Sequence, residues 1–120
     1  MARRPAQRGG RRRERVVAAP RRGDVHWVAL DPTIGSEVRK TRRCIVVSPD
    51  GMNERLRTVL VVPLTTKGFR ATLNINDRSV LALVDQVRAI DKTRLHRRML
   101  ELDADALRAV LGTLREMFAQ

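Results

Sequence analysis

The sequence is poor in the residues that form disulfide frameworks, metal sites and aromatic surfaces. Its 120 residues include one cysteine, two histidines, one tryptophan, two phenylalanines and no tyrosine. A single cysteine excludes a disulfide within the chain and is consistent with a reducing compartment. The histidines and the cysteine lie far apart in sequence, so their spacing does not match a zinc site. We therefore expect no metal ion and no cofactor.

Long apolar runs and several catalytic signatures are also missing. No segment approaches the roughly 18 consecutive apolar residues of a membrane-spanning helix, and the N-terminus has no apolar stretch typical of a secretory signal. The acidic residues are scattered, whereas a two-metal nuclease needs clustered carboxylates. No glycine-rich phosphate loop follows a predicted strand. These features indicate one cytoplasmic domain, since 120 residues are enough for a modest hydrophobic core.

Positive charge is abundant and unevenly distributed. The net charge is +12, and residues 1–22 alone hold nine arginines against one glutamate, which leaves +4 for the rest. We predict that residues 1–22 form a disordered, Arg-rich tail and that residues 23–120 form the folded domain. Dense positive charge favours polyanions, of which polynucleotides are the commonest. The alternative is a solvated tail that binds nothing in particular.

The folded part is organised around a predicted β-hairpin that runs from Arg42 to Thr65. Two apolar, β-branched runs, Cys44–Val47 and Val59–Val62, are separated by Ser48-Pro-Asp-Gly51 and a polar stretch. Apolar runs of this length bounded by Pro, Asp and Gly predict buried strands joined by a loop.

The register of this hairpin brings together a cation and a hydroxyl. Antiparallel pairing centred on the loop places Val46 opposite Val61 and, further out, Arg42 opposite Thr65. Directly opposed side chains project from the same face, with Cβ atoms about 4.5–5.5 Å apart. A shift of one residue would send them to opposite faces. The open end of the hairpin is therefore the candidate functional site.

Other apolar or alternating segments predict further elements. The predicted strands are Asp24–Leu30, Ala71–Ile75, Ser79–Val84, Asp85–Asp91 and Met99–Leu102. Residues 31–43 are predicted to form a loop and residues 92–98 to contain a helical turn. Pro63 has no N–H, so it is expected near the end of its strand or on an edge. For His26, on the first strand, a structural role is favoured over that of a catalytic base because no partner is evident.

The clearest element is a C-terminal amphipathic helix. Asp103 is a favourable N-cap, because its carboxylate can accept hydrogen bonds from the first turn. A packed stripe follows at steps of three and four residues: Leu107, Val110, Leu111, Leu114, Met117 and Phe118. Short strands followed by one helix predict a mainly β protein, in which a strongly bent antiparallel sheet closes into a small barrel.

Several motifs occur together in an order that resembles the MazF/PemK toxins of type II toxin–antitoxin systems. They are Arg22-Gly-Asp-Val25, Leu30-Asp-Pro-Thr-Ile-Gly-Ser-Glu37, Arg42, Val61-Val-Pro-Leu-Thr-Thr66, Asp85-Gln86 and Arg88-Ala-Ile-Asp-Lys92. The resemblance covers about residues 21–118. It implies an SH3-like, PemK/MazF-like β-barrel with a C-terminal helix, and a homodimer.

The resemblance also implies an activity and two partners. The activity is metal-independent, sequence-specific cleavage of single-stranded RNA, as in an mRNA interferase, which leaves 2′,3′-cyclic phosphate and 5′-hydroxyl ends. The partners are the RNA and a cognate MazE/PemI-like antitoxin that covers the RNA groove. Among the residues here, Arg42 and Thr65 match the family's catalytic arginine and threonine. Residues expected to bind RNA are Ser36, Glu37, Arg39, Lys40, Thr66, Lys67, Asp85 and Gln86.

The sequence departs from the family pattern in three places. Val38-Arg39-Lys40 replaces the Gln-Gly-Gly of many relatives, Arg43 replaces a proline, and Leu83 stands where some relatives have an arginine. Two alternatives to an endoribonuclease stay open. One is a non-catalytic RNA-binding barrel, and the other is a gyrase-poisoning toxin of the same fold.

Overall fold

The computed structural model describes residues 19–30, 41–65, 71–75 and 78–120. The strands are β2 (Asp24–Ala29), β3 (Thr41–Val46), β4 (Thr58–Thr65), β5 (Ala71–Ile75), β6 (Arg78–Ala82), β7 (Arg88–Asp91) and β8 (Leu95–Glu101). The helices are α1 (Asp50–Arg55) and α2 (Ala104–Met117), and the 3₁₀ turns are η1 (Val84–Gln86) and η2 (Lys92–Arg94).

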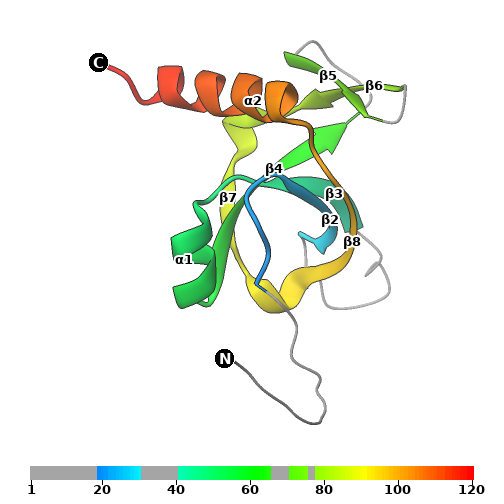
Figure 1. Cartoon of the computed structure of the whole chain (residues 1–120), viewed down its shortest axis with the longest axis vertical. Coiled ribbons are helices and arrows are strands. Elements are labelled where there is room, and N and C mark those ends of the chain that lie inside the picture. The colour runs from blue at the N-terminus through cyan, green and yellow to red at the C-terminus, as the bar shows by residue number, and fades with distance from the viewer. Residues whose placement is uncertain (1–18, 31–40, 66–70, 76–77) are drawn as a thin grey trace, which may run out of the picture.

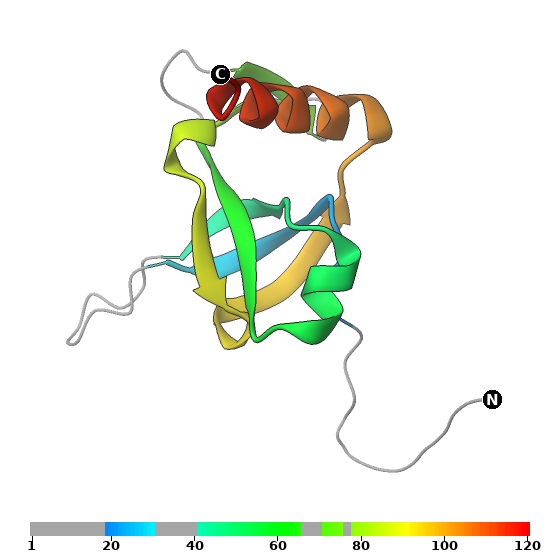
Figure 2. The ribbon, with the colours of Figure 1, turned by 90° about the vertical axis from the view of Figure 1, so that its left-hand side faces the viewer.

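The strands form one antiparallel sheet that curls into a partly closed barrel (Figure 1). Along the sheet the order is β5-β6-β4-β3-β2-β8, and β7 pairs with β4 beside β6. Helix α2 lies at one end of the molecule, whereas α1 and the entry of the N-terminal segment lie at the other (Figure 2). The predicted mainly β architecture with a C-terminal helix is confirmed. In the described part of the chain, no helix has the length and apolar character needed to cross a membrane.

The register predicted for the central hairpin is confirmed. Val46 lies opposite Val61 and Ile45 opposite Val62, and the N–H of Val47 donates to the carbonyl of Leu60 at 2.9 Å. Pro63 lies within the last three residues of β4, and its carbonyl accepts a hydrogen bond of 2.9 Å from the N–H of Leu83, the residue that follows β6. The missing N–H of proline is therefore tolerated near the end of a central strand.

Alternation along the strands sends side chains to two separate clusters. One cluster contains Val25 and Ile45 and receives Val110 from α2. The other lies on the opposite face of the sheet and contains Val28 and Val46. Neighbouring residues on β3 enter different clusters because successive side chains of a strand point to opposite faces. The register of β3 therefore fixes the composition of both clusters.

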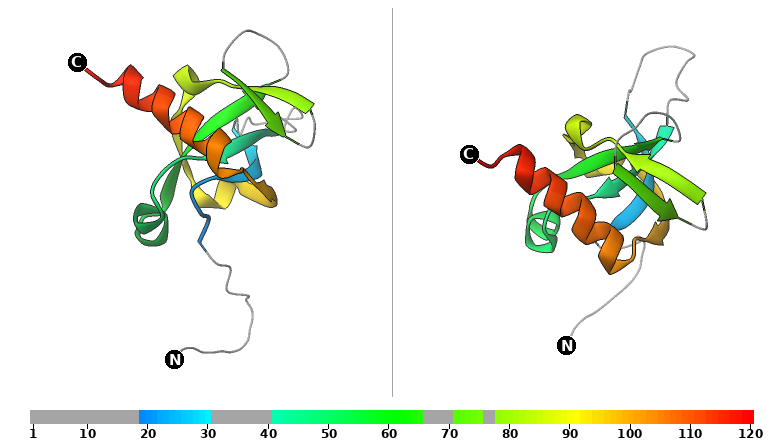
Figure 3. Two further views of the ribbon diagram at one scale, coloured as in Figure 1. Left: turned by 45° about the horizontal axis from the view of Figure 1, so that its top comes forward. Right: turned by 90° about the horizontal axis from the view of Figure 1, so that it is seen from above.

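Helix α2 covers the first of these clusters (Figure 3). Asp103 caps it as predicted, since its carboxylate accepts a hydrogen bond of 2.8 Å from the N–H of Ala106. Val110 is 1% exposed, and full burial of such a side chain contributes about 1.5–3 kcal/mol. The predicted stripe is wrong at its end. Met117 and Phe118 are 43% and 74% exposed, because the last turn projects beyond the sheet (Figure 1).

The loop predicted between the hairpin strands contains a short helix instead. Residues Asp50–Arg55 form α1, and Asn53 is fully buried against Ser48. The Asn53 amide donates to the carbonyl of Ser48 at 3.0 Å, and the Ser48 hydroxyl donates to the Asn53 side-chain oxygen. The same hydroxyl accepts from the N–H of Leu60 at 3.0 Å. These contacts fasten α1 to β4.

Three further predictions need correction. Asp85 and Gln86 belong to η1, so only Arg88–Asp91 of the predicted 85–91 strand is extended. In the segment predicted as a helical turn, only η2 is helical, and residues 95–98 belong to the edge strand β8, which begins earlier than predicted. Residues 41–43 belong to β3 rather than to a loop. The tail to residue 18, the loop over 31–40 and the turns at 67–70 and 76–77 lie outside the described residues.

Replacing Gly23 by alanine is expected to destabilise the fold by about 1–3 kcal/mol. Gly23 has φ of +97°, and a Cβ there would lie 3.1 Å from Leu107 of α2. The control is Gly112→Ala within α2, where a Cβ meets nothing within 4 Å and alanine should stabilise the helix by up to about 1 kcal/mol. Urea denaturation measures both changes. Equal stability of the two variants would contradict this interpretation.

Replacing Asn53 by alanine is expected to lower the free energy of unfolding by about 1–3 kcal/mol, because buried partners lose their hydrogen bonds. Arg55→Ala, at an exposed position of the same helix, should change it by less than about 0.5 kcal/mol. The same denaturation experiment tests both. A change in the free energy of unfolding for Asn53→Ala as small as that for Arg55→Ala would show that this hydrogen-bond network does not hold α1.

Candidate active site

Arg42 lies on β3, at the end of the sheet where the central hairpin opens. Its side chain is half-buried, and its Nη2 donates to the carbonyl of Leu64 at 3.3 Å. Leu64 is the residue before Thr65 on the paired strand β4. The guanidinium therefore reaches across to β4 and is held at the level of Thr65.

Thr65 is the last residue of β4 and is half-buried. The β3–β4 pairing extends to Cys44 opposite Pro63. Continued by two residues in the same register, it sets Arg42 opposite Thr65 on one face of the sheet. On its other side Thr65 pairs with Leu81 of β6. Pairing with β6 therefore holds Thr65 in place, at the level that the continued β3–β4 register assigns to Arg42.

The neighbouring cation Arg43 points to the other face. It lies opposite Trp27 on β2, whereas Arg42 lies opposite Val28. Val28 belongs to the second cluster, and Trp27 alternates away from it. The two adjacent arginines therefore separate, and only Arg42 shares a face with Thr65.

Asp85 and Gln86 are brought to the side of β4 by η1. The N–H of Leu83 donates to the carbonyl of Pro63, and the N–H of Gln86 donates to Leu83, both at 2.9 Å. Both side chains are exposed. Asp85 and Gln86 are therefore exposed polar side chains next to the C-terminal half of β4, the strand that ends at Thr65.

Cys44 lies on the same face as Arg42, two residues along β3, and is fully buried. Burial raises the pKa of its thiol from 9.0 to about 12, although the positive charges of Arg42 and Arg88 act in the opposite direction. A thiol with this pKa stays protonated and is a poor nucleophile. Arg88, which the sequence analysis named in a family motif but not as a site residue, is thus a second cation close to this face.

The remaining predicted RNA-binding residues lie outside the described residues: Ser36, Glu37, Arg39, Lys40, Thr66 and Lys67. Within the described ranges, no three His, Cys, Asp or Glu side chains form a group that could hold a metal ion.

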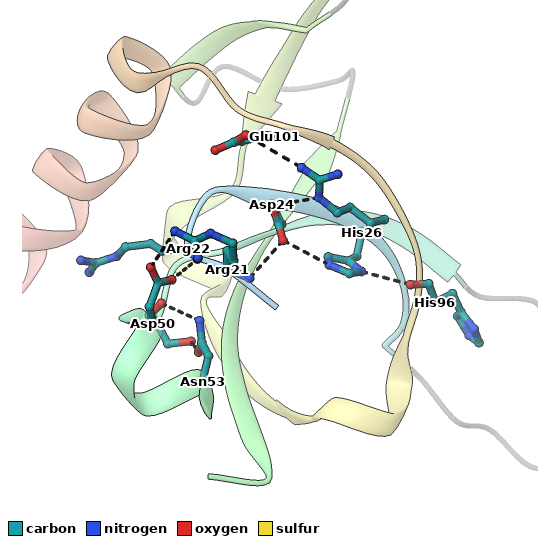
Figure 4. Close-up of polar contacts among 10 residues, drawn as sticks. Arg21, Arg22, Asp24, His26, Asp50, Asn53, His96 and Glu101 are labelled. Carbon is teal, nitrogen blue, oxygen red and sulfur yellow. Dashed lines mark hydrogen bonds and ion pairs between the residues drawn. The ribbon is translucent and has the colours of Figure 1, made fainter. Parts of the chain in front are cut away.

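A second polar cluster, which the sequence analysis also missed, joins β2 to β8 (Figure 4). Asp24 is buried, and its carboxylate accepts from Arg98 Nε at 3.0 Å and from the N–H of Arg21 at 3.0 Å. His26 lies beside it, with Nε2 at 3.9 Å from the same carboxylate. Residues 24 and 26 are two apart on a strand and so share a face. This alternation was the only sequence signal that could have placed Asp24 beside His26. Arg98 could not be paired with them before the β2–β8 register was known.

A bent antiparallel sheet with one terminal helix and an arginine–threonine pair at its open hairpin end defines a narrow class of small barrel. A family model described as "PemK-like, MazF-like toxin of type II toxin-antitoxin system" matches residues 21–118. The chain belongs to this family.

Individual relatives agree with this assignment. The chain is 40% identical over 75 residues to the endoribonuclease toxin MazF of Escherichia coli K12, covering 59% of this chain and 68% of the relative. It is 35% identical over 103 residues to the endoribonuclease PemK of Escherichia coli, covering 78% and 77%. A crystal structure of MazE-MazF from Deinococcus radiodurans matches with a TM-score of 0.67 and 25% identity, covering 85% of this chain and 98% of that chain.

The pKa of Cys44 predicts that its thiol resists alkylation in the folded protein. Iodoacetamide at pH 8–9 should label the native chain far more slowly than the chain in urea, where the thiol has its ordinary pKa of 9.0. Because the unfolded thiol ionises first, the free energy of unfolding should also fall as the pH rises from 9 towards 12. Mass spectrometry measures labelling. Equal rates in both states would contradict the assignment of Cys44 as a buried thiol.

Proposed function

We propose that this protein is the toxin of a type II toxin–antitoxin system and acts as an endoribonuclease. It cleaves single-stranded RNA without a metal ion, through attack of the substrate's own 2′-OH on the adjacent phosphorus. The products are a 2′,3′-cyclic phosphate and a 5′-hydroxyl end. DNA lacks the 2′-OH, so the mechanism excludes it as a substrate.

One observation carries the proposal. The β3–β4 register, with Val46 opposite Val61 and Cys44 opposite Pro63, sets Arg42 opposite Thr65 when it is continued. The hydrogen bond from Arg42 to the Leu64 carbonyl supports the same placement. A guanidinium and a hydroxyl on one face can contact a single phosphate between them.

This pair suits the chemistry because the nucleophile belongs to the RNA. The protein has to stabilise the negative charge that develops on the non-bridging oxygens and to help proton transfer. The planar guanidinium of Arg42 offers a fork of donors that matches phosphate geometry. A guanidinium has five N–H donors and no acceptor, so it is a poor base. We therefore assign it to transition-state stabilisation and protonation of the leaving group. The hydroxyl of Thr65 supplies a further phosphate contact.

We also propose the surroundings of this site and its partners. Asp85 and Gln86 contact the RNA from η1, where both are exposed beside β4. The protein acts in the cytoplasm as a homodimer and is neutralised by a cognate antitoxin. The Deinococcus radiodurans MazF, which this chain resembles, is found in a complex named MazE-MazF, and this supports an antitoxin partner.

Arg42→Ala and Thr65→Ala are each expected to reduce RNA cleavage by about 10²–10³-fold, since each removes a donor to the reacting phosphate. Incubation of a long RNA with the purified protein in EDTA should give discrete fragments, and their appearance measures the rate. Arg43→Ala is the matched control, because it removes the same charge from the opposite face.

Two outcomes would contradict the proposed function. One is intact RNA with the unchanged protein across a wide range of sequences. The other is a loss of cleavage in Arg43→Ala that equals the loss in Arg42→Ala, since the face of the sheet would then not matter.

A further inference from the structure

A cavity of about 980 Å³ is lined in part by β8, and no residue of α2 is among its lining residues. The segment that leads into β2, β2 itself, α1, η2 and β8 all contribute to its wall. Among the lining residues are Asp24, His26, Lys92, Leu95 and Arg97. None of these belongs to the Arg42–Thr65 site.

The ring of His26 lines this cavity, and its Nε2 is buried 3.9 Å from the Asp24 carboxylate. Its Nδ1 lies 3.0 Å from the carbonyl of His96, which can only accept, so Nδ1 carries the hydrogen. In the neutral ring, Nε2 is then an acceptor. His26 is 9% exposed, and within the described part of the protein Nε2 has no hydrogen-bond partner. A donor from a ligand or from ordered water would satisfy this buried acceptor.

The backbone is irregular on both sides of this histidine. The β2–β8 register shifts between Val25 and His26 and again between His26 and Val28. Such irregularities re-aim side chains and occur often beside functional sites. The ring lies between Asp24 and the backbone of His96 (Figure 4).

The charge of the wall favours an anionic ligand. The charged residues of the wall are four cations, Arg21, Lys92, Arg97 and Arg98, and two carboxylates, Asp24 and Glu54. Asp24 is paired with Arg98 at 3.0 Å, whereas Lys92 and Arg97 have no ion pair among the described residues. Arg97 is exposed and Lys92 is partly exposed. The described residues of the wall therefore carry a net positive charge.

The cavity is also close enough to the proposed active site to contact the same RNA. Val28 lies opposite Arg42 on β3 and opposite Leu95 on β8. Two strand spacings separate Arg42 from Leu95, which is about 10 Å. A polyanion that crosses the Arg42–Thr65 site can therefore continue to this cavity, and this continuity favours RNA over an acidic peptide.

We propose that this cavity binds a nucleotide of the single-stranded RNA outside the cleaved bond. Lys92 and Arg97 contact its phosphate, and Nε2 of His26 accepts a hydrogen bond from its ribose hydroxyl or from an N–H of its base. The inference rests on the proposed function only in taking RNA as the ligand.

The first test measures binding of a long RNA by fluorescence anisotropy, using the full chain with Thr65→Ala to prevent cleavage. Adding Lys92→Gln and Arg97→Gln should weaken binding about 10-fold and reduce the slope of log affinity against log salt by about 0.7, the value for one neutralised phosphate on a single strand. Arg108→Gln with Arg115→Gln, which removes the same charge from exposed positions of α2, should change neither quantity. Equal loss in the two double variants would overturn the proposal.

The second test examines His26 without replacing a buried residue. The chain has only two histidines, so ¹⁵N-histidine spectra resolve both rings. RNA should shift the Nε2 resonance of His26 in the Thr65→Ala protein, and saturating RNA without a shift would overturn its role as an acceptor. Polyglutamate that competes as well as RNA at equal charge would overturn RNA as the ligand and indicate an acidic protein segment.

These results can be separated from the fate of the proposed function. If the unchanged protein fails to cleave RNA while binding still depends on Lys92 and Arg97, only the proposed catalysis is wrong. If RNA is cleaved and the double variant in the otherwise unchanged chain keeps the same KM, only the cavity proposal is wrong. A raised KM with an unchanged kcat supports both.

Discussion

Pairing between β3 and β4 is the constraint on which the rest of the structure depends. It places Val46 opposite Val61 and Ile45 opposite Val62. The Ile45–Val62 pair packs in the cluster beneath α2, and the Val46–Val61 pair packs in the cluster on the opposite face of the sheet. A shift of one residue would exchange the two faces of the sheet. It would then expose apolar residues that pack beneath α2 and would also separate Arg42 from Thr65. The stability of the core and the geometry of the site are thus linked by one register.

The sequence was sufficient to predict this register and the terminal helix, because both depend on local patterns. The hairpin has apolar, β-branched runs on either side of its midpoint, and α2 has an acidic cap followed by a periodic stripe. Helix α1 has no such pattern. It is held by the buried Asn53, which bonds to Ser48, and Ser48 in turn accepts from the N–H of Leu60 on β4. Likewise, alternation through Asp85–Asp91 suggested one strand, but the chain turns at η1 before β7 begins.

The site could be predicted only where a single hairpin determines it. Arg42 and Thr65 belong to that hairpin, and Arg43 is excluded by alternation alone. In contrast, the cluster of Asp24, His26 and Arg98 depends on β2 pairing with a distant strand in an irregular register. Local patterns do not specify such pairing. The grouping of charges was equally unpredictable from local patterns, because Lys92 and Arg97 line one cavity together with Ala19–Arg21, which lie far away in the sequence.

The central claim is that the RNA supplies its own nucleophile at a site formed by Arg42 and Thr65. The most direct measurement compares an RNA oligonucleotide that the protein cleaves with the same oligonucleotide carrying one 2′-deoxy sugar on the 5′ side of the cleaved bond. We predict cleavage of the first to 2′,3′-cyclic phosphate and 5′-hydroxyl ends, and no cleavage of the second at that bond. Cleavage of the deoxy-substituted bond, or products with 5′-phosphate ends, would contradict the account.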